Sequence, residues 1–186
     1  MASPISQLIR HADAGDGAAA DELFAALYRE LHAIAERQLH HGGSELSLGT
    51  TTLLHEAYLN IREREGVRFP SRGQFLAYAA RAMRGLMIDY GRRNRTKKRG
   101  GEFHITSAWI DLAPAEAREP GADLEQLGAA LDRLSQADAE LAQLVDLHFF
   151  CGFSLTELAE LRGVSRRTVQ RDWTRARLLL HRLLQD

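Results

Sequence analysis

Residues 154–180, SLTELAELRGVSRRTVQRDWTRARLLL, decide the fold of the C-terminal part of the chain. Ser154 and Glu157 have the spacing of a capping box, in which the serine oxygen accepts a free amide and the glutamate reaches back. Gly163 suits the left-handed position just past a helix end, and Ser165 can cap a second helix. The stretch therefore predicts two short helices joined by a tight turn.

The second predicted helix has two contrasting faces. Its apolar residues recur at spacings of four, three and four, which places them on one buried stripe: Val169, Trp173, Ala176 and Leu180. A rotation of about 100° per residue puts a polar set on the opposite side: Arg167, Gln170, Arg171 and Thr174. Arginine and glutamine have forked groups that read guanine and adenine edges. The pattern predicts a DNA-binding helix-turn-helix, with Arg166 nearer the phosphates.

An amphipathic helix pair with a merely solvated polar face is the alternative interpretation. Residues 162–182 contain seven arginines and a single acid, Asp172. A solvated face normally mixes both signs of charge. The imbalance therefore favours DNA binding.

The charge of the chain is segregated, although its net value is only −1. Residues 92–99, RRNRTKKR, hold six basic residues and no acid, whereas residues 111–126 hold five acids and one base. Basic residues at a helix end complement the helix dipole, but that effect accounts for only one or two of the six. We expect phosphate contacts from this basic run, through Arg92, Arg93, Arg95, Lys97 and Lys98.

Several classes of function are disfavoured. The chain has one cysteine, Cys151, so an intrachain disulfide is impossible. We expect Cys151 to be a small residue of the core. The eight histidines show no metal-ligand spacing, so we expect neither a metal nor a cofactor. No apolar run is long enough for membrane insertion, and the N-terminus has no signal-peptide core. The sequence predicts a cytoplasmic, nucleoid-associated protein.

Helical periodicity runs through almost the whole chain and predicts an all-α fold of two small domains. We expect an N-terminal domain at 1–98, a flexible linker at 99–121 with a short ordered piece around 103–110, and a helix-turn-helix domain at 122–186. The N-terminal helices are expected near 5–12, 18–40, 51–64 and 74–93, with Arg81 and Arg84 off the core face of the last. Further helices are expected from about 123, including one capped by Ser135.

Two motifs in this order make the chain resemble the extracytoplasmic-function (ECF) group of bacterial RNA polymerase sigma factors. Residues 152–159, GFSLTELA, and 165–169, SRRTV, resemble the domain that reads the minus-thirty-five promoter element. Residues 53–59, LLHEAYL, resemble the helix that docks on the polymerase, and residues 75–79, FLAYA, and 87–90, MIDY, resemble the segment that opens the minus-ten element. The two matches cover about residues 23–99 and 131–183.

The resemblance implies a non-enzymatic subunit that binds core RNA polymerase, at the largest-subunit clamp and the beta flap, and promoter DNA. It implies polymerase-binding residues on the 53–59 helix: Leu53, Leu54, Glu56, Tyr58 and Leu59. It leaves open whether a Ser/Thr protein kinase or an anti-sigma protein acts as a partner.

One departure from the group concerns the start of the polymerase-docking helix. Most members place several acids there, whereas this chain has Gly49, Thr50, Thr51 and Thr52. Three threonines could simply begin a helix. Phosphothreonine, however, would restore about −1.5 to −2 charges at the helix N-terminus. We therefore hypothesise activation by phosphorylation, first at Thr51, then at Thr52 or Thr50.

Two other functions compete with this interpretation. A stand-alone helix-turn-helix regulator would dimerise on a palindromic operator, and would leave the basic run unexplained. An enzyme acting on nucleic acid would need convergent carboxylates or a metal cluster. Glu63 and Glu65 are the only candidates, and they lie beside Arg62 and Arg64. We interpret them as the solvent-exposed edge of a loop.

Overall fold

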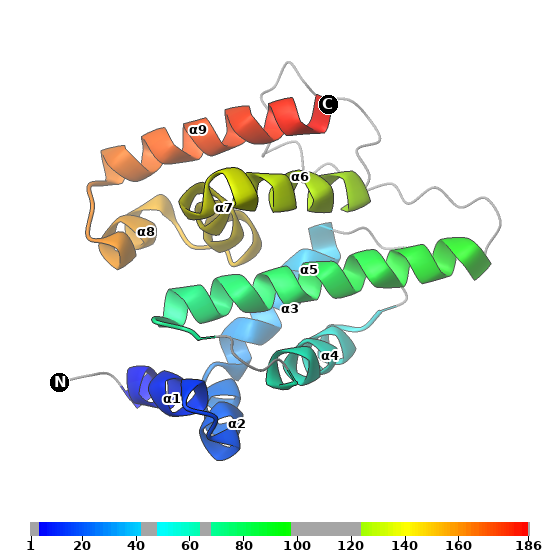
Figure 1. Ribbon diagram of the computed structural model, residues 1–186, viewed down its shortest axis with the longest axis vertical. Coiled ribbons are helices and arrows are strands. Elements are labelled where there is room, and N and C mark those ends of the chain that lie inside the picture. Colours follow the sequence, from blue (N-terminus) through cyan, green and yellow to red (C-terminus); the bar gives the residue numbers. More distant parts are fainter. Residues whose placement is uncertain (1–3, 42–47, 64–67, 98–123, 186) are drawn as a thin grey trace.

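The computed structural model describes residues 4–41, 48–63, 68–97 and 124–185, which contain helices and no strand (Figure 1). We call the described part of 4–97 the N-terminal half and residues 124–185 the C-terminal half. The N-terminal half contains α1 (Pro4–Asp13), α2 (Gly17–Ala26), α3 (Tyr28–His41), α4 (Thr50–Arg62) and α5 (Arg72–Lys97). The C-terminal half contains α6 (Leu124–Ala137), α7 (Ala139–Val145), the π-helical segment η3 (Asp146–Phe150), α8 (Leu155–Arg162) and α9 (Arg166–Gln185). The all-α prediction is confirmed.

Helices α8 and α9 form the predicted helix-turn-helix. The Glu157 amide donates to Ser154 Oγ at 3.2 Å, and the Ser154 amide donates to Glu157 Oε2 at 2.8 Å, so both bonds of the capping box form. The hydrogen bond with the Ser154 side chain, followed by that with its backbone, holds the pKa of Glu157 below its usual value. Gly163 ends α8 with φ +65°, and Ser165 Oγ accepts the Thr168 amide at 3.1 Å. Each local signal in this stretch therefore acts as predicted.

The apolar stripe of α9 is buried along its whole length. Val169 and Ala176 are 0% exposed and Leu180 is 1% exposed. The Trp173 ring meets His148 edge to face at 4.5 Å, and His148 Nδ1 lies 2.6 Å from the Phe153 carbonyl oxygen. These contacts fix the rotation of α9 about its own axis, because any turn of the helix would lift Trp173 off the core.

The predicted single helix at 18–40 is wrong, because the chain forms two helices there. Leu27 interrupts the helix with φ −100° and ψ 6°, and it is 0% exposed. No glycine or proline marks this position, so the hydrophobic period runs through it. The break is a tertiary effect, in which α2 and α3 change direction around a buried leucine.

The predicted cap at Ser135 is also wrong, because Ser135 lies inside α6. Asp138 caps α7 instead, and its Oδ1 accepts the Leu141 amide at 3.1 Å. Serine and aspartate are comparable N-cap residues. The two lie three residues apart, and packing of α6 and α7 selects the second. The predicted short ordered piece at 103–110 lies outside the described residues.

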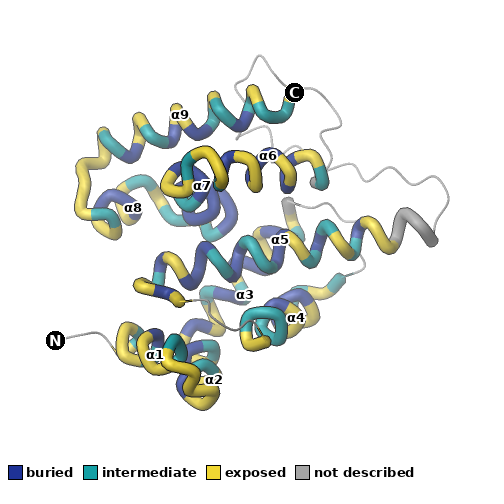
Figure 2. The backbone as a smooth tube through the Cα atoms, in the orientation of Figure 1, coloured by how far each residue is buried: buried dark blue, intermediate teal, exposed yellow. Residues whose placement is uncertain are grey.

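Helix α5 lies between the C-terminal half and α4 (Figure 1), and buried residues line it on more than one side (Figure 2). Its contacts with η3 and α6 join the two halves, whose buried residues form one hydrophobic cluster. At this junction the Cys151 thiol donates to the Leu76 carbonyl oxygen at 3.6 Å, and burial raises the pKa of that thiol strongly. The division into domains at 1–98 and 122–186 stays a prediction.

Arg84 is not off the core, contrary to the sequence-based prediction. It is 4% exposed, and its Nη1 donates to Oδ1 of buried Asp146 at 2.8 Å. The prediction failed because the core-facing stripe of α5 was judged as if only one side of the helix were covered. The C-terminal half covers a second side.

The turn of the helix-turn-helix depends on glycine at position 163. A side chain at φ +65° costs about 1–2 kcal/mol, so Gly163→Ala should lower the free energy of unfolding by about that amount. Gly85→Ala is the matched control, because Gly85 lies inside α5 and an added Cβ atom would meet no neighbouring side chain or helix within 4 Å. That control should stabilise the protein by about 0.5–1 kcal/mol. Urea denaturation followed by circular dichroism measures both, and an unchanged Gly163→Ala midpoint would contradict the assignment.

Candidate nucleic-acid interface

The face of α9 opposite its buried stripe is exposed. The predicted base-reading residues and their phosphate-contacting neighbour all lie on it: Arg166, Arg167, Gln170, Arg171 and Thr174. Figure 2 shows exposed residues along the outer edge of α9, away from the rest of the molecule. Thr174 Oγ1 donates to the Gln170 carbonyl oxygen at 3.0 Å, which leaves its hydroxyl lone pairs for a further donor. The arrangement can present several arginine and amide groups to a groove of DNA at once.

Three other charged residues of this motif have structural partners: Arg162, Asp172 and Arg175. Asp172 Oδ2 lies 3.9 Å from Arg162 Nη1, and Asp172 Oδ1 lies 3.8 Å from Arg171 Nε. Arg162 also donates to the Glu140 carbonyl oxygen at 2.7 Å, and Arg175 Nη2 lies 3.5 Å from Asp138 Oδ2. Arg162 and Arg175 therefore tie the motif to α7. Neither arginine belongs to the predicted base-reading set, and their pairing with α7 agrees with that division.

The basic run begins inside α5, not after it. The sequence predicted a helix end near residue 93, but α5 continues to Lys97, because arginine and lysine favour the C-terminal end of a helix dipole. Arg92 and Arg93 are exposed. Arg92 donates from Nη2 to Glu125 Oε1 at 2.8 Å, so a predicted phosphate-binding residue is paired with an acid of α6. The side chains of Arg95 and Lys97 and the whole of Lys98 lie outside the described residues.

Two of the predicted polymerase-binding residues face inward. Leu53 is 0% and Leu54 is 2% exposed, so both belong to the core beneath α4 and are not available to touch a partner. Tyr58 is half-buried: its hydroxyl donates to Asp21, which raises the pKa of Tyr58, and its ring packs on Phe24 at 4.4 Å. Leu53 and Leu54 therefore position α4, and their predicted direct contact with polymerase is corrected accordingly. For Tyr58 that contact stays a prediction.

The outer side of α4 presents a different set. Thr51, Thr52 and Glu56 are exposed, and Thr50 and Leu59 are half-buried. Gly49 is the N-cap residue, no side chain caps the helix, and no acid lies in its first turn. Among the described residues, no side chain accepts from the amides at the start of α4, and no acid lies in its first turn.

No catalytic constellation accompanies these surfaces in the described part of the chain. No group of three or more histidine, cysteine or acidic residues there could hold a metal ion. A cleft of about 500 Å³ lies between α1, α2 and α4, but its Asp13 carboxylate already accepts the Phe69 amide at 2.8 Å. None of the described helices has the length and apolarity needed to cross a membrane.

Sequence reasoning missed the contacts that join the halves, Asp146 with Arg81 and Arg84, and Glu125 with Arg92. One feature of the sequence could have indicated the buried ion pair. Asp146 stands in the run LVDLHFF, where an acid surrounded by large apolar residues must be buried and therefore paired. The identity of its partners could not be read from the chain.

Comparison with known proteins identifies a family. A family model described as ECF sigma factor matches residues 2–186. Neither the curated proteins nor the solved structures yielded a match to this chain. The family model covers both halves, including the α4 to α5 region and the helix-turn-helix. The chain belongs to the ECF sigma factors, non-enzymatic proteins that bind core RNA polymerase and promoter DNA and direct promoter-specific transcription initiation.

Proposed function

We propose that three surfaces of this sigma factor have separate roles. Helix α9 reads the minus-thirty-five element through Arg167, Gln170 and Arg171. The basic run at the end of α5 holds promoter DNA near the melted region. The outer side of α4 docks on the clamp of the largest polymerase subunit. The observation that carries the proposal is α9 itself, whose apolar stripe is buried while its arginine and glutamine face is exposed.

The α9 surface combines two kinds of contact. Arg167, Gln170 and Arg171 on the exposed face would contact base edges. Arg166, the first residue of the helix, would contact phosphates. Phosphate contacts set position without reading sequence, whereas base contacts discriminate. The two roles should therefore separate in binding measurements.

Replacing base-reading residues should relax promoter choice. Arg171→Ala should reduce discrimination at one or two base positions by about 1–3 kcal/mol, because a forked contact to a base edge is lost. Arg166→Ala is the control and should weaken binding equally for all sequences. Competitive binding to a library of minus-thirty-five variants measures both. Unchanged selectivity after joint replacement of Arg167, Gln170 and Arg171 by alanine would show that another face reads the DNA.

The basic run should act through charge. Replacing Arg93, Lys97 and Lys98 by alanine should abolish open-complex formation and spare binding to core polymerase. The slope of log affinity for single-stranded promoter DNA against log salt should flatten by about 0.7 per lost contact, or about 2 in all. Permanganate footprinting detects the melted bases. Normal melting by the triple variant would contradict the assignment.

The docking surface on α4 begins without negative charge. We propose that a Ser/Thr kinase phosphorylates the threonine cluster, with Thr51 the first choice and Thr52 the second, and that the modified helix docks on a basic polymerase surface. Support comes from Gly49 as the N-cap, which puts Thr50, Thr51 and Thr52 in the first turn. A phosphate there would lie beside the amides of the first turn and at the positive end of the helix dipole. Thr51 and Thr52 are exposed, as a kinase requires.

Phosphorylation of this cluster can be tested with a position-matched control. Thr51→Ala and Thr52→Ala together should abolish capture of core polymerase from cells and promoter-reporter activity. Thr156→Ala is the control, because Thr156 is also exposed and also the second residue of its helix, α8. It should leave polymerase capture unchanged. Full capture and reporter activity for the Thr51 and Thr52 double variant would mean that these threonines only begin the helix.

A further inference from the structure

The cleft between α1, α2 and α4 has mainly apolar walls. Its volume is about 500 Å³, within the range of about 300–1,000 Å³ that is usual for small-molecule sites. Two aromatic pairs form part of the walls. Phe24 of α2 packs on Tyr58 of α4 with 4.4 Å between the ring centres, and Phe69 meets Phe75 of α5 edge to face at 5.2 Å. The cleft therefore offers a small molecule both apolar contact and aromatic rings.

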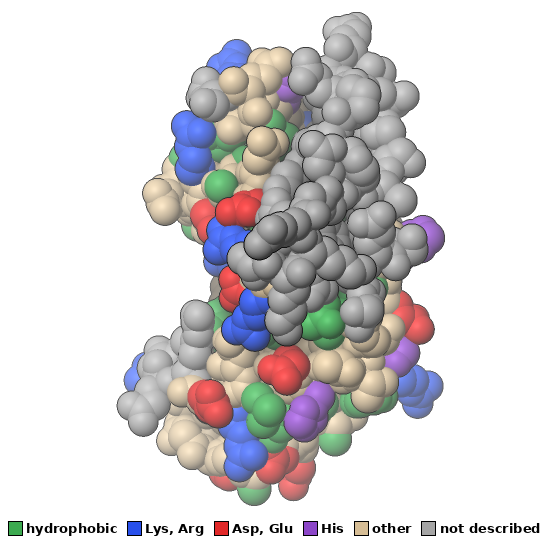
Figure 3. Space-filling view, turned by 90° about the vertical axis from the view of Figure 1, so that its right-hand side faces the viewer, with side chains coloured by type: hydrophobic (Ala, Val, Ile, Leu, Met, Phe, Trp, Pro, Cys, Tyr) green, Lys and Arg blue, Asp and Glu red, His purple; other side chains and the backbone are tan. Residues whose placement is uncertain are grey.

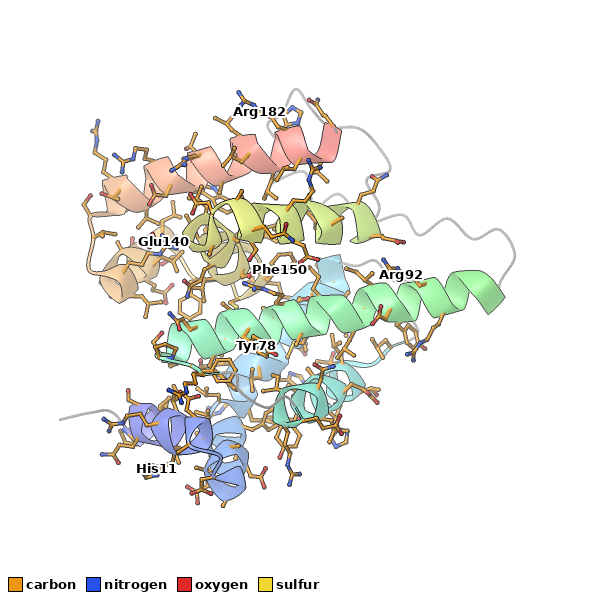
Figure 4. All side chains as sticks on the ribbon, in the orientation of Figure 1. His11, Tyr78, Arg92, Glu140, Phe150 and Arg182 are labelled. Carbon is orange, nitrogen blue, oxygen red and sulfur yellow. The ribbon has the colours of Figure 1, made fainter. Side chains whose placement is uncertain are left out.

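Packing outside the cleft holds these rings in place. Phe69 and Phe75 are buried, and Phe69 also packs against Tyr78 with 5.1 Å between the ring centres. In Figure 4 Tyr78 lies on the lower side of α5, toward α1 and α2. Leu23, another residue of the cleft, belongs to the same buried cluster. A ligand would therefore meet a largely preformed surface, which lowers the entropy cost of binding.

Two carboxylates stand on the wall formed by the turn between α1 and α2. The oxygens of Asp13 accept the Phe69 amide at 2.8 Å and 3.0 Å, and Asp16 Oδ1 accepts the Ala18 and Ala19 amides. A carboxylate has about four lone-pair positions, so both side chains can accept further hydrogen bonds. Within the described part of the chain, neither acid forms an ion pair with a basic side chain.

Arg62 is the only cation among the described residues that line the cleft, and it faces another acid. The Tyr58 hydroxyl donates to Asp21 and also interacts with Arg62, so an acid and a base meet at this hydroxyl. Asp13 and Asp16 have no such neighbour. The outer surface of the N-terminal half is different, because acidic and basic side chains lie side by side in the lower part of Figure 3. The cleft therefore combines negative charge with aromatic walls.

We propose that this cleft binds a small organic cation, in which an ammonium group is attached to an apolar body. Ring faces attract an ammonium group within about 6 Å of their centres. Asp13 and Asp16 add a Coulomb attraction that an uncharged ligand lacks, and they repel an anion. The ammonium group also donates to the lone pairs that the Phe69 amide leaves on Asp13. The inference goes beyond the proposed function, and its test needs neither DNA nor polymerase.

A bound cation would connect elements from separate parts of the N-terminal half. It would touch the α1–α2 turn, α2 at Phe24 and α4 at Tyr58. Ligand binding to the folded state alone stabilises that state. Thr51, Thr52 and Glu56, on the outer side of α4, do not line the cleft. The ligand would therefore brace α4 from behind and leave its outer side exposed.

A matched series of probes tests the charge of the ligand. 4-Phenylbutylamine is a cation at neutral pH, whereas 4-phenylbutanol and 4-phenylbutyrate carry a neutral and an anionic group on the same ring and chain. In proton–nitrogen correlation spectra of the full chain, the amine should shift the Gly15 and Phe69 amide signals saturably, with a dissociation constant below about 1 mM. The alcohol should bind at least about tenfold more weakly, and the anion more weakly still. Equal affinity for amine and alcohol, or no saturable shift, would overturn the site.

The role of Asp13 is tested by removing only its charge. Asp13→Asn keeps a carbonyl oxygen that can accept the Phe69 amide. The variant should bind 4-phenylbutylamine about tenfold more weakly and 4-phenylbutanol with unchanged affinity. Asp132→Asn is the control, because Asp132 is an exposed acid of α6 and the change of net charge is identical. An equal loss of amine affinity in the two variants would mean that the net charge of the chain, not the cleft, attracts the amine.

The aromatic wall is tested by a change that keeps the side chain apolar. Phe24→Leu should lower the ratio of amine affinity to alcohol affinity about threefold, because a cation–π contact is lost. This ratio is the readout, since a mere loss of packing would lower both affinities. Tyr28→Leu is the control, because Tyr28 also contacts the Phe24 ring but is exposed and does not line the cleft. An unchanged ratio in Phe24→Leu, or the same change in both variants, would refute the aromatic contribution.

Discussion

The buried carboxylate of Asp146 is the constraint on which the arrangement of the two halves depends. A charge that is 1% exposed must be paired, since an isolated carboxylate in the core is not tolerated. Asp146 opens the π-helical segment between α7 and α8, and its own half leaves both oxygens to donors from α5. Arg84 is equally buried and equally in need of a partner. The two requirements are met together only when the C-terminal half lies against α5.

This junction affects the DNA-binding surfaces unequally. The exposed face of α9 points away from α5, so the predicted base-reading residues stay accessible while the two halves are in contact (Figure 2). The arginine face of α5 is covered, and the basic run starts at its edge with Arg92 already paired to Glu125.

Helix α4 shows how one short motif serves two purposes. Its apolar residues, Leu53 and Leu54, and the Tyr58 hydroxyl bound to Asp21 face the N-terminal half and hold the helix in place. Its outer side is exposed and begins with three threonines. The family resemblance concerns residues 53–59 as a whole. Burial divides them into side chains that hold α4 in place and side chains that are accessible to a partner.

The sequence by itself determined the features that depend on near neighbours. The capping box at Ser154, the left-handed turn at Gly163 and the two faces of α9 follow from spacings of three and four residues, and all were predictable. The break at Leu27, the cap at Asp138 and the burial of Arg84 were decided only by the tertiary structure. In each case the local pattern was compatible with more than one outcome, and packing between helices selected one. The pairing of Asp146 with Arg81 and Arg84 joins residues more than sixty positions apart, and no local propensity encodes such a distance.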